Sequence, residues 1–338
     1  MAPTNAQAGR NRSPQPEFWD RVILLEHFTH TPPAQPRLRQ GKQEKIASHT
    51  RRCSVPSATL DPRRLYFPDT ASRPGRHLAV SPKNSDLEYL HYARIRLAAG
   101  LSATSFETGP RETGLLCMKG SCRLRVTLAS TTSEHTAAPQ SIELGLQDGV
   151  YIPRGSVVEV SSEGEADLVE CSAEVSGEYP LQIVRYADVA KTPALKFSAG
   201  GEASRRDLNI VIGNNVKAGR IVAGFTRSAP GNWTSWPPHE HAAILEEAYV
   251  YYDMPAPAFG VQLVYSSPER AECAQIVRDG DAVLMPSGYH PNVAAPGHSI
   301  NFIWMMAART EVTDRLFGVV NVQPGFGDKG SGLEASRK

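Results

Sequence analysis

The stretch PPHEHAAILEEAYVYY, residues 237–252, carries the pattern from which the fold is best predicted. Its second half, Ala248 to Tyr252, is rich in aromatic and β-branched residues, which is typical of a β-strand. Its first half holds His239 and His241. Alternate side chains of an extended backbone share a face, so these two imidazoles should point the same way. We therefore expect a pair of histidines beside a buried strand.

A second segment, PSGYH at residues 286–290, supplies a third imidazole. The residues before it, Asp281 to Met285, again predict a strand. If the two strands pair in a small barrel, His290 can face the first two histidines across the interior. Three imidazoles and one carboxylate are enough to hold a divalent transition metal and leave positions open for a substrate. The spacing therefore predicts a metal site.

From about residue 77 onward the chain reads as a series of short strands. Turns between them carry Gly, Pro, Asp and Ser, and helical periodicity is rare. Short strands at regular spacing indicate an all-β sandwich or barrel. The strands we expect here are 89–97, 114–118, 122–128, 141–146, 149–152, 157–160 and 220–224.

An internal repeat suggests two related barrels in tandem. Gly149-x3-Pro153-x-Gly155 in the first half resembles Gly280-x5-Pro286-x-Gly288 in the second. The first copy has no His-x-His, so the second barrel should carry the metal and the first should be structural. We place the first barrel at residues 76–195 and the second at 196–325, with a flexible tail at 326–338.

Residues 1–75 differ from the rest in composition. Arginine, proline, serine and glutamine dominate, and only Phe18 to Phe28 looks able to pack or to form a short helix. A segment with so few apolar residues cannot bury enough surface to offset its ordering entropy. We expect a largely disordered, basic and proline-rich extension.

Composition narrows the class of protein. The 338 residues carry a formal net charge of +1, which gives no support for a nucleic-acid partner. No run of 18 or more apolar residues and no secretory signal is visible, so a cytoplasmic protein without a membrane partner is expected. The five cysteines fit reduced thiols better than a disulfide framework, and we expect Cys117 and Cys122 to be core residues.

Three motifs together resemble a known family. They are PGNWTSWPPHEH at 230–241, LEEAY at 245–249 and PSGYHP at 286–291. From about residue 77 to 310 the chain resembles the bicupin uronate isomerases, the group that contains 5-deoxy-glucuronate isomerase of inositol catabolism and 4-deoxy-5-ketouronate isomerase of pectin breakdown. The resemblance implies a bicupin: two tandem double-stranded β-helix (jelly-roll) barrels. The first and third motifs are closer to the inositol enzyme, whereas residues 251–254 and 301–307 lean toward the pectin enzyme.

The same resemblance implies a set of metal ligands. They fall on His239, His241, His290 and one of two adjacent glutamates. General cupin spacing favours Glu246, whereas alignment on the Tyr-x-Tyr that follows favours Glu247, which we prefer. Neighbours in a strand face opposite sides, so only one of the two can be a ligand. One divalent ion is implied, with zinc preferred and manganese or iron left open.

The activity that the resemblance implies is an aldose–ketose isomerisation of 5-deoxy-D-glucuronate to 5-dehydro-2-deoxy-D-gluconate. Such a reaction moves a proton between adjacent carbons through an enediol, and a divalent metal stabilises the developing charge. The alternatives are the ketouronate reaction of pectin breakdown, another cupin chemistry such as an iron dioxygenase, and a non-catalytic sugar-binding cupin.

Further residues are candidates for proton transfer and substrate binding. The candidates for proton transfer are the non-ligand glutamate (Glu246 on our preference), Tyr249, Tyr251 and Tyr289. The substrate carboxylate should be bound by a cation that can donate two hydrogen bonds, as arginine does. We prefer Arg220 and Arg309 for this role, and Arg205 and Arg206 are further candidates. Trp236 is a candidate for substrate binding as a pocket wall, with a role as a core anchor left open. The expected partner is a small uronate, and the formation of a homodimer is left open.

Overall fold

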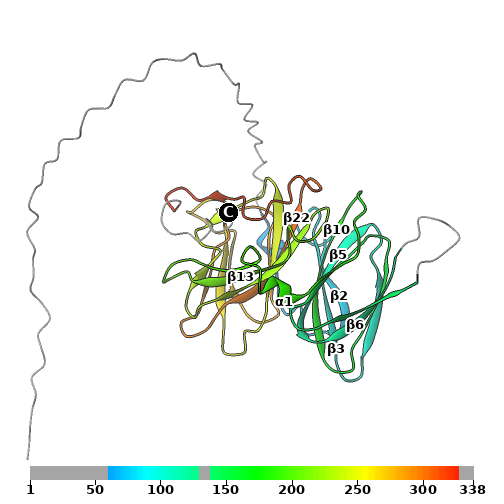
Figure 1. Ribbon diagram of the computed structural model, residues 1–338. Helices are drawn as coiled ribbons and strands as arrows, with labels where there is room; N and C mark the ends of the chain where they lie inside the picture. Colours follow the sequence, from blue (N-terminus) through cyan, green and yellow to red (C-terminus); the bar gives the residue numbers. More distant parts are fainter. Residues whose placement is uncertain (1–59, 129–137, 327–338) are drawn as a thin grey trace, which may run out of the picture. The chain divides into compact units, whose positions relative to one another are not determined.

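The protein is known from a computed structural model, which describes residues 60–128 and 138–326. Within these ranges nearly all regular structure is β-strand (Figure 1). The exceptions are one short helix, α1 (Tyr186–Val189), and one turn of 3-10 helix, η1 (Pro62–Arg64). The prediction of an all-β fold is confirmed. The possible helix at 18–28 and the tail beyond residue 326 lie outside the described residues.

The first barrel consists of two sheets. The larger has the strand order β11-β8-β5-β10-β3-β2 and the smaller has the order β4-β9-β6-β7. Figure 1 labels β5, β10 and β3 of the larger sheet. The strands are β2 (Gly75–Val80), β3 (His91–Leu97), β4 (Ala103–Glu107), β5 (Arg111–Gly120), β6 (Cys122–Thr127), β7 (Gln140–Leu144), β8 (Gly149–Ile152), β9 (Val157–Ser161), β10 (Ala166–Glu174) and β11 (Gln182–Val184).

The second barrel repeats this plan. Its larger sheet has the order β1-β20-β17-β22-β14-β13-β12, its smaller sheet has the order β15-β21-β18-β19, and a short ladder joins β16 to β23. The strands are β1 (Tyr66–Phe67), β12 (Lys196–Ala199), β13 (Arg206–Ile212), β14 (Ile221–Ser228), β15 (Trp233–Thr234), β16 (His239–Glu240), β17 (Leu245–Tyr251), β18 (Gly260–Val264), β19 (Cys273–Val277), β20 (Ala282–Met285), β21 (Asn292–Ala294), β22 (Asn301–Ala308) and β23 (Asn321–Val322).

The register of the large sheets shows that the two barrels are equivalent. In the first barrel Thr113 of β5 stands opposite Ile152 of β8. In the second, Glu247 of β17 stands opposite Met285 of β20. Both partners are followed by the Pro-x-Gly turn that forms the sequence repeat, so Thr113 occupies the place that Glu247 has in the second barrel. The predicted tandem repeat is therefore present in the structure.

The interior of the first barrel is apolar. Side chains from both of its sheets fill it, among them Ile95, Leu115, Leu124 and Val150. Cys117 and Cys122 belong to this core, as expected, and both are free thiols. Such an interior offers hydrophobic burial, and among the described residues of this barrel no group of side chains is placed to hold a metal ion.

The two large sheets pack against each other through their outer faces. Val169 and Cys171 of β10 meet Ile221 and Ala223 of β14 in one continuous core. All seven residues of β17 are buried, because one face of this strand lines its own barrel and the other meets the first barrel. A strand with two buried faces loses the alternation of polar and apolar residues that a surface strand shows.

The first described residues belong to the second barrel. Tyr66 and Phe67 form β1, which pairs with Val283 and Ala282 of β20. The prediction that residues 1–75 form a disordered extension is therefore wrong for residues 60–75. Leu65 is fully buried, and its packing, together with the strand pairing, orders a segment whose composition alone predicts disorder.

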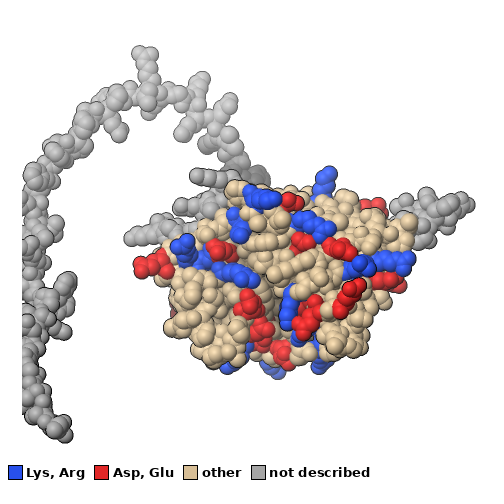
Figure 2. All heavy atoms as spheres, turned by 60° about the horizontal axis from the view of Figure 1, so that its bottom comes forward, with Lys and Arg blue, Asp and Glu red and all other residues tan. Residues whose placement is uncertain are grey.

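The described part of the chain contains no helix long and apolar enough to cross a membrane. On the face shown in Figure 2, basic and acidic side chains are interspersed. That face therefore offers no patch of a single sign to a charged polymer. The expectation that nucleic acids are not partners stays a prediction.

Candidate metal centre

Three histidines converge inside the second barrel. His239 lies on β16, His241 follows it by two residues, and His290 lies between β20 and β21. All three are buried, and one nitrogen from each lies within 4.8 Å of the others. The barrel fold thus brings β16 and the turn after β20 together, although they are distant in sequence. The spacing of the histidines predicted this convergence.

Backbone carbonyls fix the orientation of each imidazole. Nδ1 lies 2.8 Å from the Pro237 oxygen in His239 and 3.0 Å from the Leu245 oxygen in His241. In His290 the distance from Nδ1 to the Gly288 oxygen is 2.9 Å. A carbonyl can only accept, so each Nδ1 carries the proton and each Nε2 is left as a lone-pair donor. Three such nitrogens at one point form a donor set that suits a transition metal.

Glu247 adds a carboxylate to this cluster. Its Oε2 lies 3.0 Å from Nε2 of His241 and 3.2 Å from Nε2 of His290. Nε2 of His290 and Oε1 of Glu247 are nevertheless buried without a hydrogen-bond partner. Orphaned donor atoms of this kind, in a buried set of three nitrogens and one oxygen, fit a divalent cation.

The electrostatics of Glu247 and His239 agree with ligand chemistry, whereas at His241 burial is outweighed by the neighbouring Glu247 carboxylate, which raises the pKa of that imidazole. Burial would raise the pKa of Glu247, but the imidazoles of His241 and His290 beside its carboxylate outweigh this effect and lower the pKa to about 2. Burial lowers the pKa of His239 to about 3, helped by the two neighbouring imidazoles. An ionised carboxylate and a neutral imidazole are the forms that bind metals.

Glu246 faces away from the histidines. Its carboxylate accepts hydrogen bonds from the backbone N–H groups of residues 88, 89 and 90 in the first barrel, at 2.6–2.7 Å. Strand alternation places it on the interface face of β17, whereas Glu247 lies on the interior face. Of the two glutamates between which the sequence left the choice open, the structure brings Glu247 to the cluster. The position of Glu246 contradicts its proposed role in proton transfer.

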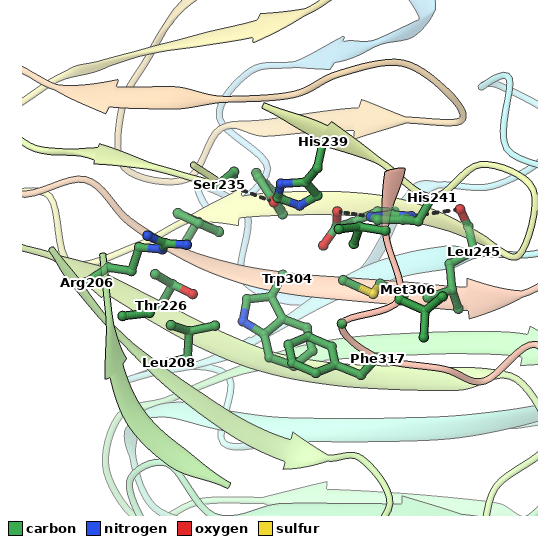
Figure 3. A pocket seen from close by; sticks show the side chains of 17 residues that line it. Arg206, Leu208, Thr226, Ser235, His239, His241, Leu245, Trp304, Met306 and Phe317 are labelled. Carbon is green, nitrogen blue, oxygen red and sulfur yellow. Dashed lines mark hydrogen bonds and ion pairs between the residues drawn. The ribbon is translucent and has the colours of Figure 1, made fainter. Parts of the chain in front are cut away.

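His239, His241 and Glu247 line a pocket of mixed polarity (Figure 3). Apolar walls come from Leu208, Trp304, Met306 and Phe317, among others. The polar groups that line it besides the cluster are the side chains of Arg206, Thr226, Ser235 and Tyr249. Largely apolar walls with a few polar groups are typical of a site for a small molecule.

Of the tyrosines predicted to transfer protons, the structure brings Tyr249 to the pocket. Its hydroxyl lies 2.7 Å from Oγ of Ser235, and burial, together with the charge of Glu247, raises its pKa well above the ordinary value. Tyr251 instead donates a hydrogen bond of 2.6 Å to Gln262 in the core. Tyr289 packs its ring against Tyr265, outside the pocket lining.

The arginines and the tryptophan preferred for substrate binding lie elsewhere. Arg220 donates to the carbonyls of Glu174 and Ala308 near the interface of the barrels. Arg309 binds the carboxylate of Glu88 at 2.9 Å. None of the three lines the pocket, and the Trp236 ring packs against Trp233 and Phe326. Both guanidinium groups are thus occupied by contacts between parts of the fold.

Arg206 is the candidate arginine that reaches the pocket. It opens β13, and Arg206, Leu208 and Ile210 alternate on the face that lines the second barrel. Arg205, its neighbour, is exposed. The period-two pattern of β13 was readable in the sequence and could have favoured Arg206 over Arg205, but the adjacent pair could equally be a solvated turn.

The segment after β22 completes the pocket and was not anticipated. Residues 317–320 line the pocket, and the Phe317 ring stacks on Trp304 with ring centroids 4.8 Å apart. Further along, Val322 of β23 pairs with His239 of β16. The segment that follows β22 therefore also pairs with β16, the strand that carries the candidate ligand His239.

Comparison with known proteins agrees with this arrangement. The chain is 28% identical over 252 residues to the 5-deoxy-glucuronate isomerase of Geobacillus kaustophilus strain HTA426, which covers 72% of this chain and 89% of the relative. It is 26% identical over 239 residues to the enzyme of the same name from Bacillus subtilis strain 168, covering 68% of this chain and 86% of the relative.

Solved structures agree on the fold. An IolB-like protein from Salmonella typhimurium LT2 superimposes with a TM-score of 0.65 at 21% identity, covering 78% of this chain and 98% of that one. A variant of Bacillus subtilis oxalate decarboxylase gives a TM-score of 0.52 at 13% identity, covering 73% of this chain and 78% of that one. These likenesses support the bicupin fold.

The pattern that describes the KduI/IolB family matches residues 65–318. This range takes in both barrels, the four clustered side chains and Phe317 of the pocket wall. The protein belongs to the KduI/IolB family.

Proposed function

We propose that this protein is a metal-dependent aldose–ketose isomerase that acts on a uronate, with 5-deoxy-D-glucuronate as its substrate and 5-dehydro-2-deoxy-D-gluconate as its product. The observation that carries the proposal is the cluster of His239, His241, Glu247 and His290 at one side of a small pocket. The names of the curated relatives support the choice of substrate.

The ligand set proposed here is three Nε2 atoms and one oxygen of Glu247. A divalent metal held there would act as a Lewis acid toward the carbonyl and the neighbouring hydroxyl of an open-chain sugar. The chain's part is to hold the imidazoles in one tautomer, through the carbonyls of residues 237, 245 and 288. The apolar walls exclude water, which strengthens each electrostatic contact inside.

Tyr249 is the residue that we propose as a hydrogen-bond donor to the substrate oxygens. Its raised pKa keeps the phenol protonated at physiological pH, so it donates a hydrogen bond rather than accepting a proton as phenolate. Ser235 orients the hydroxyl. A donor placed beside the reacting carbonyl stabilises the negative charge that develops as the enediol forms.

The test is proton NMR of the purified, metal-loaded protein with 5-deoxy-D-glucuronate. We expect conversion to the 2-deoxy-5-keto acid, its loss after chelation with EDTA and its return on addition of a divalent metal. The His290→Ala variant should lose conversion, while His298→Ala, which alters a histidine outside the cluster, should keep it. Conversion that survives complete removal of metal would contradict the proposal.

The second candidate is isomerisation of 4-deoxy-5-ketouronate. The family name joins two groups of proteins, and residues 251–254 of β17 and the turn after it resemble the pectin-pathway group. The same NMR assay with the ketouronate decides between them. Turnover of the ketouronate alone would replace the first substrate and keep the reaction type.

A further inference from the structure

Two arginines of the described chain are buried, and they differ in their partners. Arg94 is 4% exposed and forms an ion pair with Asp167 at 2.5 Å. Arg206 is also 4% exposed, and within residues 60–128 and 138–326 no carboxylate lies within ion-pair distance of it. The fold therefore neutralises one buried guanidinium and leaves the other without a counter-charge.

The hydrogen bonds of Arg206 do not replace a counter-charge. Its Nη1 donates to the Ser204 oxygen at 3.0 Å, and its Nη2 donates to the Trp236 oxygen at 2.7 Å. Carbonyl groups satisfy two of the five N–H donors of a guanidinium and carry no formal charge. Burial lowers the pKa of Arg206 to about 10, which reflects the free energy spent on removing this cation from water. At neutral pH it stays charged.

The position of Arg206 makes it available to a bound molecule. It lines the same pocket as the histidine cluster, and Figure 3 shows Arg206 and His241 on opposite sides of Trp304. One end of a molecule that fills the pocket can therefore contact the histidine cluster, while its other end contacts the guanidinium of Arg206. Thr226 and Ser235 lie at the arginine side and can bind hydroxyls between the two ends.

We propose that Arg206 binds the carboxylate of the substrate and makes the pocket specific for acid sugars. The proposal rests on the proposed function for the identity of the sugar, and it adds the residue that distinguishes an acid from a neutral sugar. A carboxylate that enters the pocket supplies the missing counter-charge, and its two oxygens match the planar donors of arginine. Because Arg206 is buried, this ion pair is stronger than one at the surface. The carbonyl end of the same molecule then lies at the histidine cluster.

The experiment compares an acid sugar with its neutral analogue in matched variants. Metal-loaded wild type, R206M, R206K and R205M are assayed by proton NMR with 5-deoxy-D-glucuronate and with 5-deoxy-D-glucose, in which a hydroxymethyl group replaces the carboxylate. R205M is the control, since Arg205 is adjacent and exposed. Isothermal titration calorimetry with both sugars measures binding apart from turnover, and metal content and melting temperature report on folding.

We expect R206M to raise the KM and the Kd for the acid at least about tenfold, because an ion pair with two hydrogen bonds is lost. Values for the neutral sugar should stay within about twofold, since this loss acts through the carboxylate. R206K keeps the charge but not the planar donors, so it should show a smaller increase for the acid alone. R205M should match wild type.

Other results would overturn the inference. Equal weakening of both sugars would show that Arg206 only supports the shape of the pocket, and unchanged values for the acid in both R206M and R206K would show that it binds nothing. If wild type binds the acid without converting it and R206M does not bind it, Arg206 keeps its role and the proposed isomerase fails. If wild type binds neither sugar, both proposals fail.

Discussion

At the scale of single residues, two adjacent glutamates of one strand have different surroundings. Glu247 lies against His241 and His290 in the interior of the second barrel. Glu246, one position earlier, accepts three backbone N–H groups of the first barrel. The alternation of an extended backbone is enough to separate them. Identical side chains thus acquire unlike chemistry from the direction in which the strand presents them.

The first prediction separates the two glutamates. Glu247→Gln should weaken metal binding more than about 100-fold, because even partners outside the ligand set contribute about 10–100-fold to affinity. It should abolish isomerase activity for the same reason. Metal content by mass spectrometry after dialysis, together with the NMR assay, measures both effects.

The matched control is Glu246→Gln. This variant should keep its metal and its turnover, because the side chain points away from the cluster. A loss of metal in Glu246→Gln with retention in Glu247→Gln would reverse the ligand assignment.

The second prediction concerns Tyr249. Tyr249→Phe removes a hydroxyl that lines the pocket and leaves the ring in its packing against Phe302, with centroids 4.2 Å apart. We expect kcat to fall about 100-fold with little change in KM, as when a donor to a developing oxyanion is lost. Tyr251→Phe is the control. It should cost about 1 kcal/mol of stability, since a core hydrogen bond to Gln262 is lost, and should leave kcat nearly unchanged.

At the scale of elements, β5 and β17 make reciprocal contacts between the barrels. Glu112 of β5 accepts hydrogen bonds from the N–H groups of Gly219, Arg220 and Ile221, at 2.5–2.8 Å. Glu246 of β17 does the same with residues 88–90. Each strand therefore uses one carboxylate to accept hydrogen bonds from the backbone amides at the start of a strand in the other barrel. An unpaired buried amide would be costly, which explains a charge at so buried a position.

The third prediction tests this equivalence. Glu112→Gln and Glu246→Gln should each lower the free energy of unfolding by roughly 2–4 kcal/mol, because an amide can accept fewer of the three hydrogen bonds and carries no charge. Urea unfolding measures the loss. Glu202→Gln, at an exposed position, should change stability by less than about 0.5 kcal/mol. A stable Glu112→Gln variant would show that these contacts do not hold the barrels together.

At the scale of the whole molecule, the two barrels share one strand arrangement but have different interiors. The first barrel has an apolar interior, with Thr113 at the place equivalent to Glu247. The second barrel surrounds a cluster of three histidines and one glutamate, and a pocket. The apolar side chains inside the first barrel stabilise its large sheet, and the second barrel packs against the outer face of that sheet. The second barrel can then retain buried polar groups, such as the histidine cluster, that do not contribute to its stability.

The fourth prediction follows from this asymmetry. The purified protein should bind one divalent metal ion per chain, and His290→Ala should remove that ion. Chelation should lower the melting temperature and abolish activity together, because the ion binds the folded chain and not the unfolded one. Calorimetry with and without EDTA, and metal analysis of both proteins, provide the measurement. Two ions per chain would contradict an apolar first barrel.

The sequence by itself determined the all-β class, the tandem repeat and the convergence of His239, His241 and His290. These follow from local patterns: period-two strands, turn residues, and histidines placed next to predicted strands. Tertiary structure alone decided which glutamate joins the histidines, which arginine lines the pocket, and that residues 66–67 and 317–320 belong to the second barrel. The reason is physical. Segments from distant parts of the chain pack against a strand, and this packing decides which face of the strand becomes interior and which segment covers that face. Arg206 and Arg220 are both arginines at the start of a strand, and only the packing around them leaves one without a counter-charge in the pocket.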